Sequence, residues 1–200
     1  MNKFGAVVVG LILGGAVVYS APLAWNYWHG SAYMRQHMAH HGTENGHMMQ
    51  GGMMHDEENM PMLNGVNTTE QEADDLKALF KNHLAINRRV EMLPNGIKTV
   101  TESDDEAIRT ALVNHVAGMI NRVEVGDNPQ IPIQSAMLTP IFEGGQTITT
   151  EINATETGVE VIQTSTDPVV VEALQKHATE VSDLAARGMQ AVHEQMMARH

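Results

Sequence analysis

Methionine and histidine side chains are concentrated in one stretch of the chain, from Met34 to Met62. Apolar residues in this stretch follow neither a helical nor a strand period, which argues against a packed core. Thioethers bind Cu(I), and imidazoles add capacity for Cu(II), so this pairing suits copper better than magnesium, calcium or manganese. We therefore predict a flexible copper-collecting arm, the alternative being a low-complexity tether that binds metals only adventitiously. The predicted ligands are Met34, His37, Met38, His40, His41, His47, Met48, Met49, Met53, Met54, His55, Met60 and Met62.

A second candidate metal site comes from two histidines that lie 62 residues apart, His115 and His177. Each falls in the middle of an apolar stripe with helical spacing, and Met119 follows His115 by one helical turn. If folding brings the pair together, they could bind copper, with Met119 as third ligand, or ligate a haem iron from both sides. The alternative is that both are buried core histidines, hydrogen-bonded to their neighbours. Val181 stands where a symmetric site would need a second methionine.

Two further groups of potential ligands are less specific. His83 precedes the first predicted hairpin, and its counterpart at the same 62-residue shift is Gly145. The C-terminal tail, residues 189–200, is predicted to be helical and carries a stripe that is either a second metal site or an amphipathic helix end. This stripe consists of Met189, His193, Met196, Met197 and His200.

Charge and composition argue against several classes of function. The net charge of −12, with no basic stripe, argues against a nucleic-acid partner. The chain has no cysteine, so thiolate metal sites, disulfides, a cysteine nucleophile and covalent haem attachment through C-x-x-C-H are excluded. G-x-S-x-G, H-E-x-x-H and a phosphate-binding glycine loop are also missing. We therefore predict that the protein is not an enzyme.

The N-terminal segment, residues 1–29, is predicted to target the chain to a membrane. No charge interrupts the run from Phe4 to Trp25, and an aromatic cluster follows it, ending at Tyr33. An apolar run of about 20 residues can span a bilayer with such a cluster at the interface. The alternative is a cleavable signal peptide that ends near Ser20. With Lys3 on the cytoplasmic side, both interpretations place the rest of the chain in the periplasm, anchored to the inner membrane or released from it.

The residues that follow predict the elements that must position these side chains. A tether over residues 30–67 leads to a helix that begins at the capping sequence Thr-Thr-Glu-Gln-Glu from Thr68. Two β-favouring runs then flank a Pro-Asn-Gly turn at 94–96, which predicts a hairpin. A long helix is predicted from the Ser-Asp-Asp-Glu cap at 103–106 to Gly126.

The same plan recurs at a constant shift of 62 residues. Repeats 76–126 and 138–188 align without a gap, within a duplicated domain over residues 68–188. In the second copy Pro140 weakens the first helix, predicted from Ser135 to Phe142. We predict an α+β two-layer sandwich, in which a four-stranded antiparallel sheet carries helices on one face and the two halves are related by pseudo-twofold symmetry. The shift maps Gly96 onto Gly158, Ser103 onto Ser165, Asp105 onto Asp167, His115 onto His177 and Gly126 onto Gly188.

These motifs also resemble those of a family of exported bacterial proteins. The resemblance rests on RRVEMLPNGIKTVTESDDEAI and NHVAGM in the first repeat and on ETGVEVIQTSTDPVVVEALQKHA in the second, and it covers roughly residues 76–189. Members of that family often carry a signal or anchor, a Met/His-rich tract and a duplicated domain; no activity is established for them. The chain departs from the family pattern at Gly144 and Gly145, where a polar helix end with a histidine is expected.

Together these patterns favour a membrane-anchored periplasmic copper buffer or chaperone. Metal collected by the Met/His tract would pass to a site near His115 and His177, and a periplasmic copper protein would be a natural partner. One alternative is a haem-binding sensor or electron carrier that uses the two histidines. Another is an interaction module whose tract is only a tether.

Overall fold

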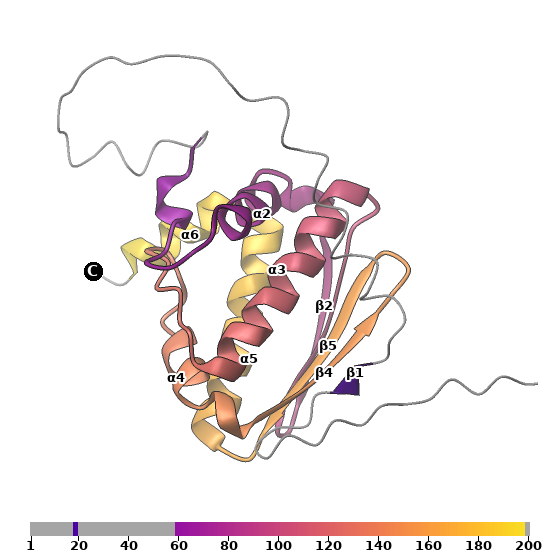
Figure 1. Ribbon diagram of the computed structural model, residues 1–200, viewed down its shortest axis with the longest axis vertical. Coiled ribbons are helices and arrows are strands. Elements are labelled where there is room, and N and C mark those ends of the chain that lie inside the picture. Colours follow the sequence, from indigo (N-terminus) through magenta and orange to yellow (C-terminus); the bar gives the residue numbers. More distant parts are fainter. Residues whose placement is uncertain (1–17, 20–58, 199–200) are drawn as a thin grey trace, which may run out of the picture.

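The computed structural model describes residues 18–19 and 59–198. Within these ranges the chain is α+β, with five α-helices and a sheet whose strand order is β1-β4-β5-β3-β2 (Figure 1). Four of the strands form an antiparallel sheet, which confirms that part of the predicted fold. These strands are β2 (Asn87–Leu93), β3 (Gly96–Glu102), β4 (Ile148–Ala154) and β5 (Gly158–Ser165).

The helices gather on one side of this sheet (Figure 1). The two long helices, α3 and α5, each follow a hairpin, and the shorter ones lie around their ends. The bounds are α2 Glu70–Lys81, α3 Glu106–Val125, α4 Leu138–Glu143, α5 Pro168–Arg187 and α6 Met189–Met197. Three short 3-10 helices complete the described elements, η2 Pro61–Leu63, η3 His83–Ala85 and η4 Gly145–Thr147.

Local hydrogen bonds place the helix starts where the capping sequences predict them. Thr69 and Glu72 form a reciprocal capping box at the start of α2. The side chain of Asp105 accepts from the first backbone N–H groups of α3, and Asp167 does the same for α5. Gly126, with φ of 70°, ends α3 in the left-handed conformation that glycine adopts without steric cost.

Element ends recur at the predicted shift of 62 residues. The shift takes η3 onto η4, the first residue of β3 onto that of β5, and both ends of α3 onto those of α5. In the sheet, β3 pairs with β5 so that Thr99 lies directly opposite Val161, its own counterpart at this shift. Equivalent segments of the two halves therefore meet at the centre of the sheet.

The glycines at the two hairpins, Gly96 and Gly158, allow the backbones of β3 and β5 to approach closely. A Cβ on Gly96 would lie 1.9 Å from the backbone oxygen of Gln163, and one on Gly158 would lie 2.1 Å from that of Thr101. Neither glycine has a positive φ, and the first turn consists of Pro94 and Asn95, with Gly96 already in β3. The Asn-Gly signal thus marks a hairpin correctly, whereas the glycine itself is needed because two backbones approach closely.

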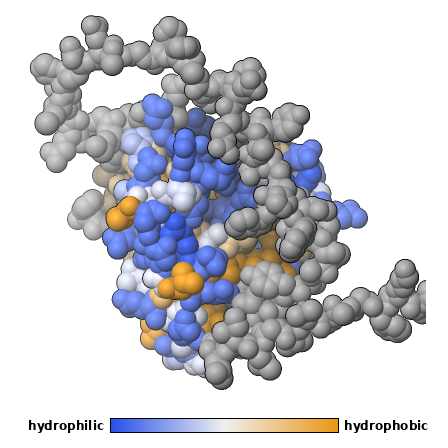
Figure 2. All heavy atoms as spheres, in the orientation of Figure 1, coloured by the Kyte–Doolittle hydropathy of each residue, from blue (hydrophilic) through white to orange (hydrophobic). Residues whose placement is uncertain are grey.

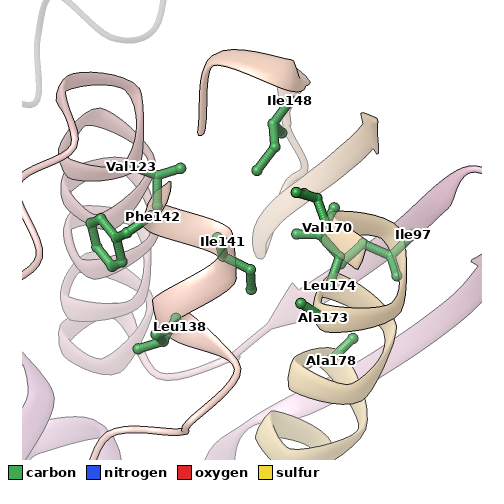
Figure 3. Packing of buried hydrophobic residues seen from close by; sticks show 10 residues of the cluster. All are labelled: Ile97, Val123, Leu138, Ile141, Phe142, Ile148, Val170, Ala173, Leu174 and Ala178. Carbon is green, nitrogen blue, oxygen red and sulfur yellow. The ribbon is translucent and has the colours of Figure 1, made fainter. Parts of the chain in front are cut away.

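The main core lies between α4, α5 and the sheet (Figure 3). Its buried residues come from both halves of the chain, and Val170 and Leu174 on α5 are only 2% and 1% exposed. The visible surface of the helices is mostly hydrophilic with scattered apolar residues (Figure 2), which agrees with the acidic composition. The core residues in Figure 3 are Ile97, Val123, Leu138, Ile141, Phe142, Ile148, Val170, Ala173, Leu174 and Ala178.

A buried arginine ties the start of α2 to the end of α3. Arg122, 8% exposed, donates through Nε to Glu72 at 2.6 Å and through Nη1 to Asp127 at 2.5 Å. A further bond from Nη2 reaches the backbone oxygen of Asn67 at 3.0 Å. The hydrogen bond from Arg122 lowers the pKa of the Glu72 carboxyl to about 2.

The predicted anchor and tether lie mostly outside the described residues. Within the anchor, Val18–Tyr19 form strand β1, which pairs parallel with Glu151 and Ile152 of β4. Near the end of the predicted tether, Met60 is 4% and Leu63 0% exposed, so this part is packed on the domain. Among the residues that the structure describes, no helix is long and apolar enough to cross a membrane.

Candidate functional site: a cavity between sheet and helices

A cavity of about 290 Å³ lies between the inner face of the sheet and helices α3 and α5. Residues of α2 and of the segment 131–135 complete its wall, which is mostly aliphatic. Several polar side chains nevertheless reach it, as is common in small-molecule pockets. These polar residues are His83, Arg88, Thr99, Thr101, His115, Gln134, Ser135, Gln163, His177, Glu180 and Gln195.

The cavity brings together the two histidines that the repeat predicts. His115 lies near the middle of α3 and His177 at the matching place on α5, and both line the cavity. Burial, the largest cause, and electrostatic repulsion from His177 together lower the pKa of His115 to about 4, although Glu72 opposes the shift. His115 is therefore neutral near pH 7, which is the form of imidazole that binds metal ions.

One ring nitrogen of His177 is left without a hydrogen bond. Its Nδ1 is buried and has no hydrogen-bond partner in the described part of the chain. The nearest carboxylate oxygen, Oε2 of Glu180, lies 3.9 Å away, which is too far for a hydrogen bond. This carboxylate instead accepts a short bond from the hydroxyl of Ser135. A buried polar atom without a partner is costly, so a ligand that uses this nitrogen would be stabilised.

Met119 and His83 complete the set of metal-binding side chains around the cavity. Met119 lies one turn after His115 and also lines the cavity wall. His83 is held differently, because its Nδ1 bonds the backbone oxygen of Ala185 at 3.1 Å and its ring packs against Gly188. Among the described residues no group of three or more His, Cys, Asp or Glu is arranged to hold a metal. The imidazoles of His115 and His177 and the thioether of Met119 nevertheless line the same cavity.

The other predicted ligands are not brought to this cavity in the described residues. Those from Met34 to His55 lie outside the described residues, as does His200. Met60 is buried and Met62 lies in η2, and neither lines the cavity. On α6 the buried residues are Ala191 and Val192, whereas Met197 is 66% exposed.

Arg88 is a cavity residue that sequence patterns did not predict. Its side chain enters the cavity from β2, and Nη1 donates to Thr101 Oγ1 at 2.6 Å. Burial lowers the pKa of the guanidinium to about 10. Arg88 stands between Ile86 and Val90 in a two-residue alternation of inward-facing positions, so strand periodicity could have placed it inside.

No protein-family model, curated protein or solved structure matches the chain.

Proposed function

We propose that the protein binds copper outside the cytoplasm and acts as a copper buffer or chaperone. The observation that carries this proposal is the buried, unpartnered Nδ1 of His177, in a cavity also lined by His115 and Met119. A neutral imidazole at His115 needs no deprotonation before it binds a metal ion. Cu(I) accepts few ligands and favours thioether and imidazole donors, so these three side chains suit it.

In this proposal the Met/His tract from Met34 to Met62 supplies copper to the folded domain. It would collect copper and pass it to the cavity, as a delivery arm between a membrane anchor and the folded domain. This role belongs to the periplasm, where the charge at Lys3 and the apolar run after it would place the domain. The copper is cargo here, and a periplasmic copper protein would receive it.

The size of the cavity favours copper over haem. At about 30 Å³ for each water-sized group, 290 Å³ has room for roughly ten non-hydrogen atoms. A haem has about 40 such atoms, so most of it would lie outside the cavity. Copper fits inside it.

We also propose that the domain arose by duplication and has pseudo-twofold symmetry. Support comes from the matching element ends and from the direct pairing of Thr99 with Val161. The copper site would then be asymmetric within a symmetric frame, because Met119 has Val181 as its counterpart.

The test is a Cu(I) titration against a competing chelator under reducing conditions. The experiment compares the intact chain, a deletion of residues 34–58, a double variant His115→Leu and His177→Leu, and the control His193→Leu on the exposed side of α6. We expect the double variant to lose one tightly bound copper ion and the control to lose none. The deletion should lower the total capacity while the cavity ion remains. Failure of the intact chain to compete with the chelator would refute the proposal.

A further inference from the structure

Arg88 is a half-buried cation for which the described residues provide no acidic partner. Arg122, which is more deeply buried, has carboxylate partners in Glu72 and Asp127, and even the exposed Arg89 pairs with Glu102. Arg88 forms no salt bridge within residues 59–198 and bonds only the hydroxyl of Thr101. Its Nε is buried and makes no hydrogen bond there.

This arrangement is costly for a guanidinium that is largely removed from water. Removing a charge from water costs several kcal/mol unless an opposite charge or hydrogen bonds compensate for it. A guanidinium carries five N–H donors in a planar fork that matches a carboxylate with two parallel bonds. Arg88 therefore has unused donors, in a place where a ligand's negative charge would be strongly stabilised.

The rest of the wall indicates what this ligand's body must be. On the sheet side, Thr101 lies opposite Arg88 and Thr99 and Gln163 also line the cavity, whereas α2, α3 and α5 contribute mainly aliphatic side chains. The volume of about 290 Å³ corresponds to roughly ten non-hydrogen atoms. An anion with a long polar body would leave its polar groups against aliphatic walls, which is unfavourable.

We propose that the cavity binds a small monocarboxylate with an apolar body, such as a medium-chain fatty acid, and that Arg88 holds its carboxylate. The apolar body lies among the aliphatic side chains of α3 and α5, and Thr101 keeps the guanidinium in place. This inference is independent of copper binding, because it rests on Arg88 and the wall rather than on His115 and His177.

The experiment uses octanoate, which has ten non-hydrogen atoms, and calorimetric titration of the full chain in the presence of a metal chelator. Octanol and octylammonium share its apolar body and differ in charge, so they separate charge recognition from simple hydrophobic binding. Arg88→Met removes the charge while keeping an unbranched apolar side chain. Arg89→Met is the matched control, because Arg89 is the next residue on β2 and its side chain is 71% exposed.

We expect octanoate to bind the native chain and to lose about tenfold or more in affinity in Arg88→Met, with octanol unaffected. Arg89→Met should bind octanoate as the native chain does, and octylammonium should bind the native chain least. If Arg88→Met does not fold, Thr101→Val, which frees the guanidinium from its one hydrogen bond, should still weaken octanoate binding. Equal binding of octanoate and octanol, unchanged affinity in the folded variants, or no binding of octanoate at all would overturn the proposal. Because the chelator removes copper, the octanoate titration tests only carboxylate binding. Its failure would not refute copper binding, and failure of the Cu(I) titration would not refute carboxylate binding.

Discussion

The low pKa of His115 makes the stability of the domain depend on pH in a defined direction. Its folded-state pKa is about 4, against 6.5 for an unperturbed histidine. Between these values the unfolded chain binds a proton that the folded chain does not, so protonation favours unfolding. The contribution of His115 to stability is therefore complete above pH 6.5 and is lost progressively as the pH falls towards 4.

The size of this effect follows from the two pKa values. Integrating the linkage relation from pH 7 to pH 5 gives a loss of about 2 kcal/mol in the free energy of unfolding. Substituting His115→Leu removes the titrating group and fills its place with an apolar side chain of similar size. The variant should therefore lose about 2 kcal/mol less than the native chain over this range.

Urea unfolding followed by circular dichroism at pH 7 and pH 5, with a chelator present, measures this difference. Glu72 on α2 is present in both proteins, so its own contribution largely cancels in the comparison. Met119→Leu is the control, because it changes the cavity wall without removing a proton-binding group, and its effect should be equal at both pH values. If the native chain and His115→Leu show the same pH dependence, the argument that His115 is held neutral by burial is refuted.

Two further predictions concern the scaffold, and both are measured by urea unfolding at pH 7. Arg122→Met should lower the free energy of unfolding by about 2 kcal/mol. This is less than for a fully buried ion pair, because the side chains of its partners Glu72 and Asp127 are 30% and 44% exposed. If stability does not fall, the network does not stabilise the contact between α2 and α3. Gly96→Ala should lower the free energy of unfolding by about 2 kcal/mol or more, because the new Cβ would clash with the β5 backbone. Gly118→Ala should raise it by about 0.5–1 kcal/mol, because alanine favours the helix α3 and its Cβ would have nothing within 4 Å. Equal effects of the two alanines would contradict the close approach of β3 and β5.

Much of the fold was predictable because it depends on local signals. The caps at Thr69, Asp105 and Asp167 involve side chains and backbone groups within three residues of each other, so the sequence alone shows them. The hairpin at Pro94 was equally visible. The role of Gly96 was not, because the atom that excludes a Cβ belongs to Gln163, far away in the chain.

The candidate site was also predictable only in part. The helical period and the repeat predicted that His115, Met119 and His177 belong together, and the fold places all three on one cavity. Arg88 was missed because an arginine in a hairpin is ordinarily on the surface. What buries it is the layer of helices packed on that face of β2, which no local pattern describes.

By itself, the sequence determined the two hairpins, the caps of α2, α3 and α5, the 62-residue shift and the supply of copper-binding side chains, but not the start of α4, which lies at Leu138 rather than at the predicted Ser135. Periodicity, capping and turn chemistry act over a few residues, so they can be read along the chain. Only the tertiary structure decided that His177 Nδ1 and Arg88 Nε are buried and have no hydrogen-bond partner among the described residues. Burial and pairing depend on which distant segments pack together. This packing brings His115, His177 and Arg88 to one cavity, for which two occupants can be tested.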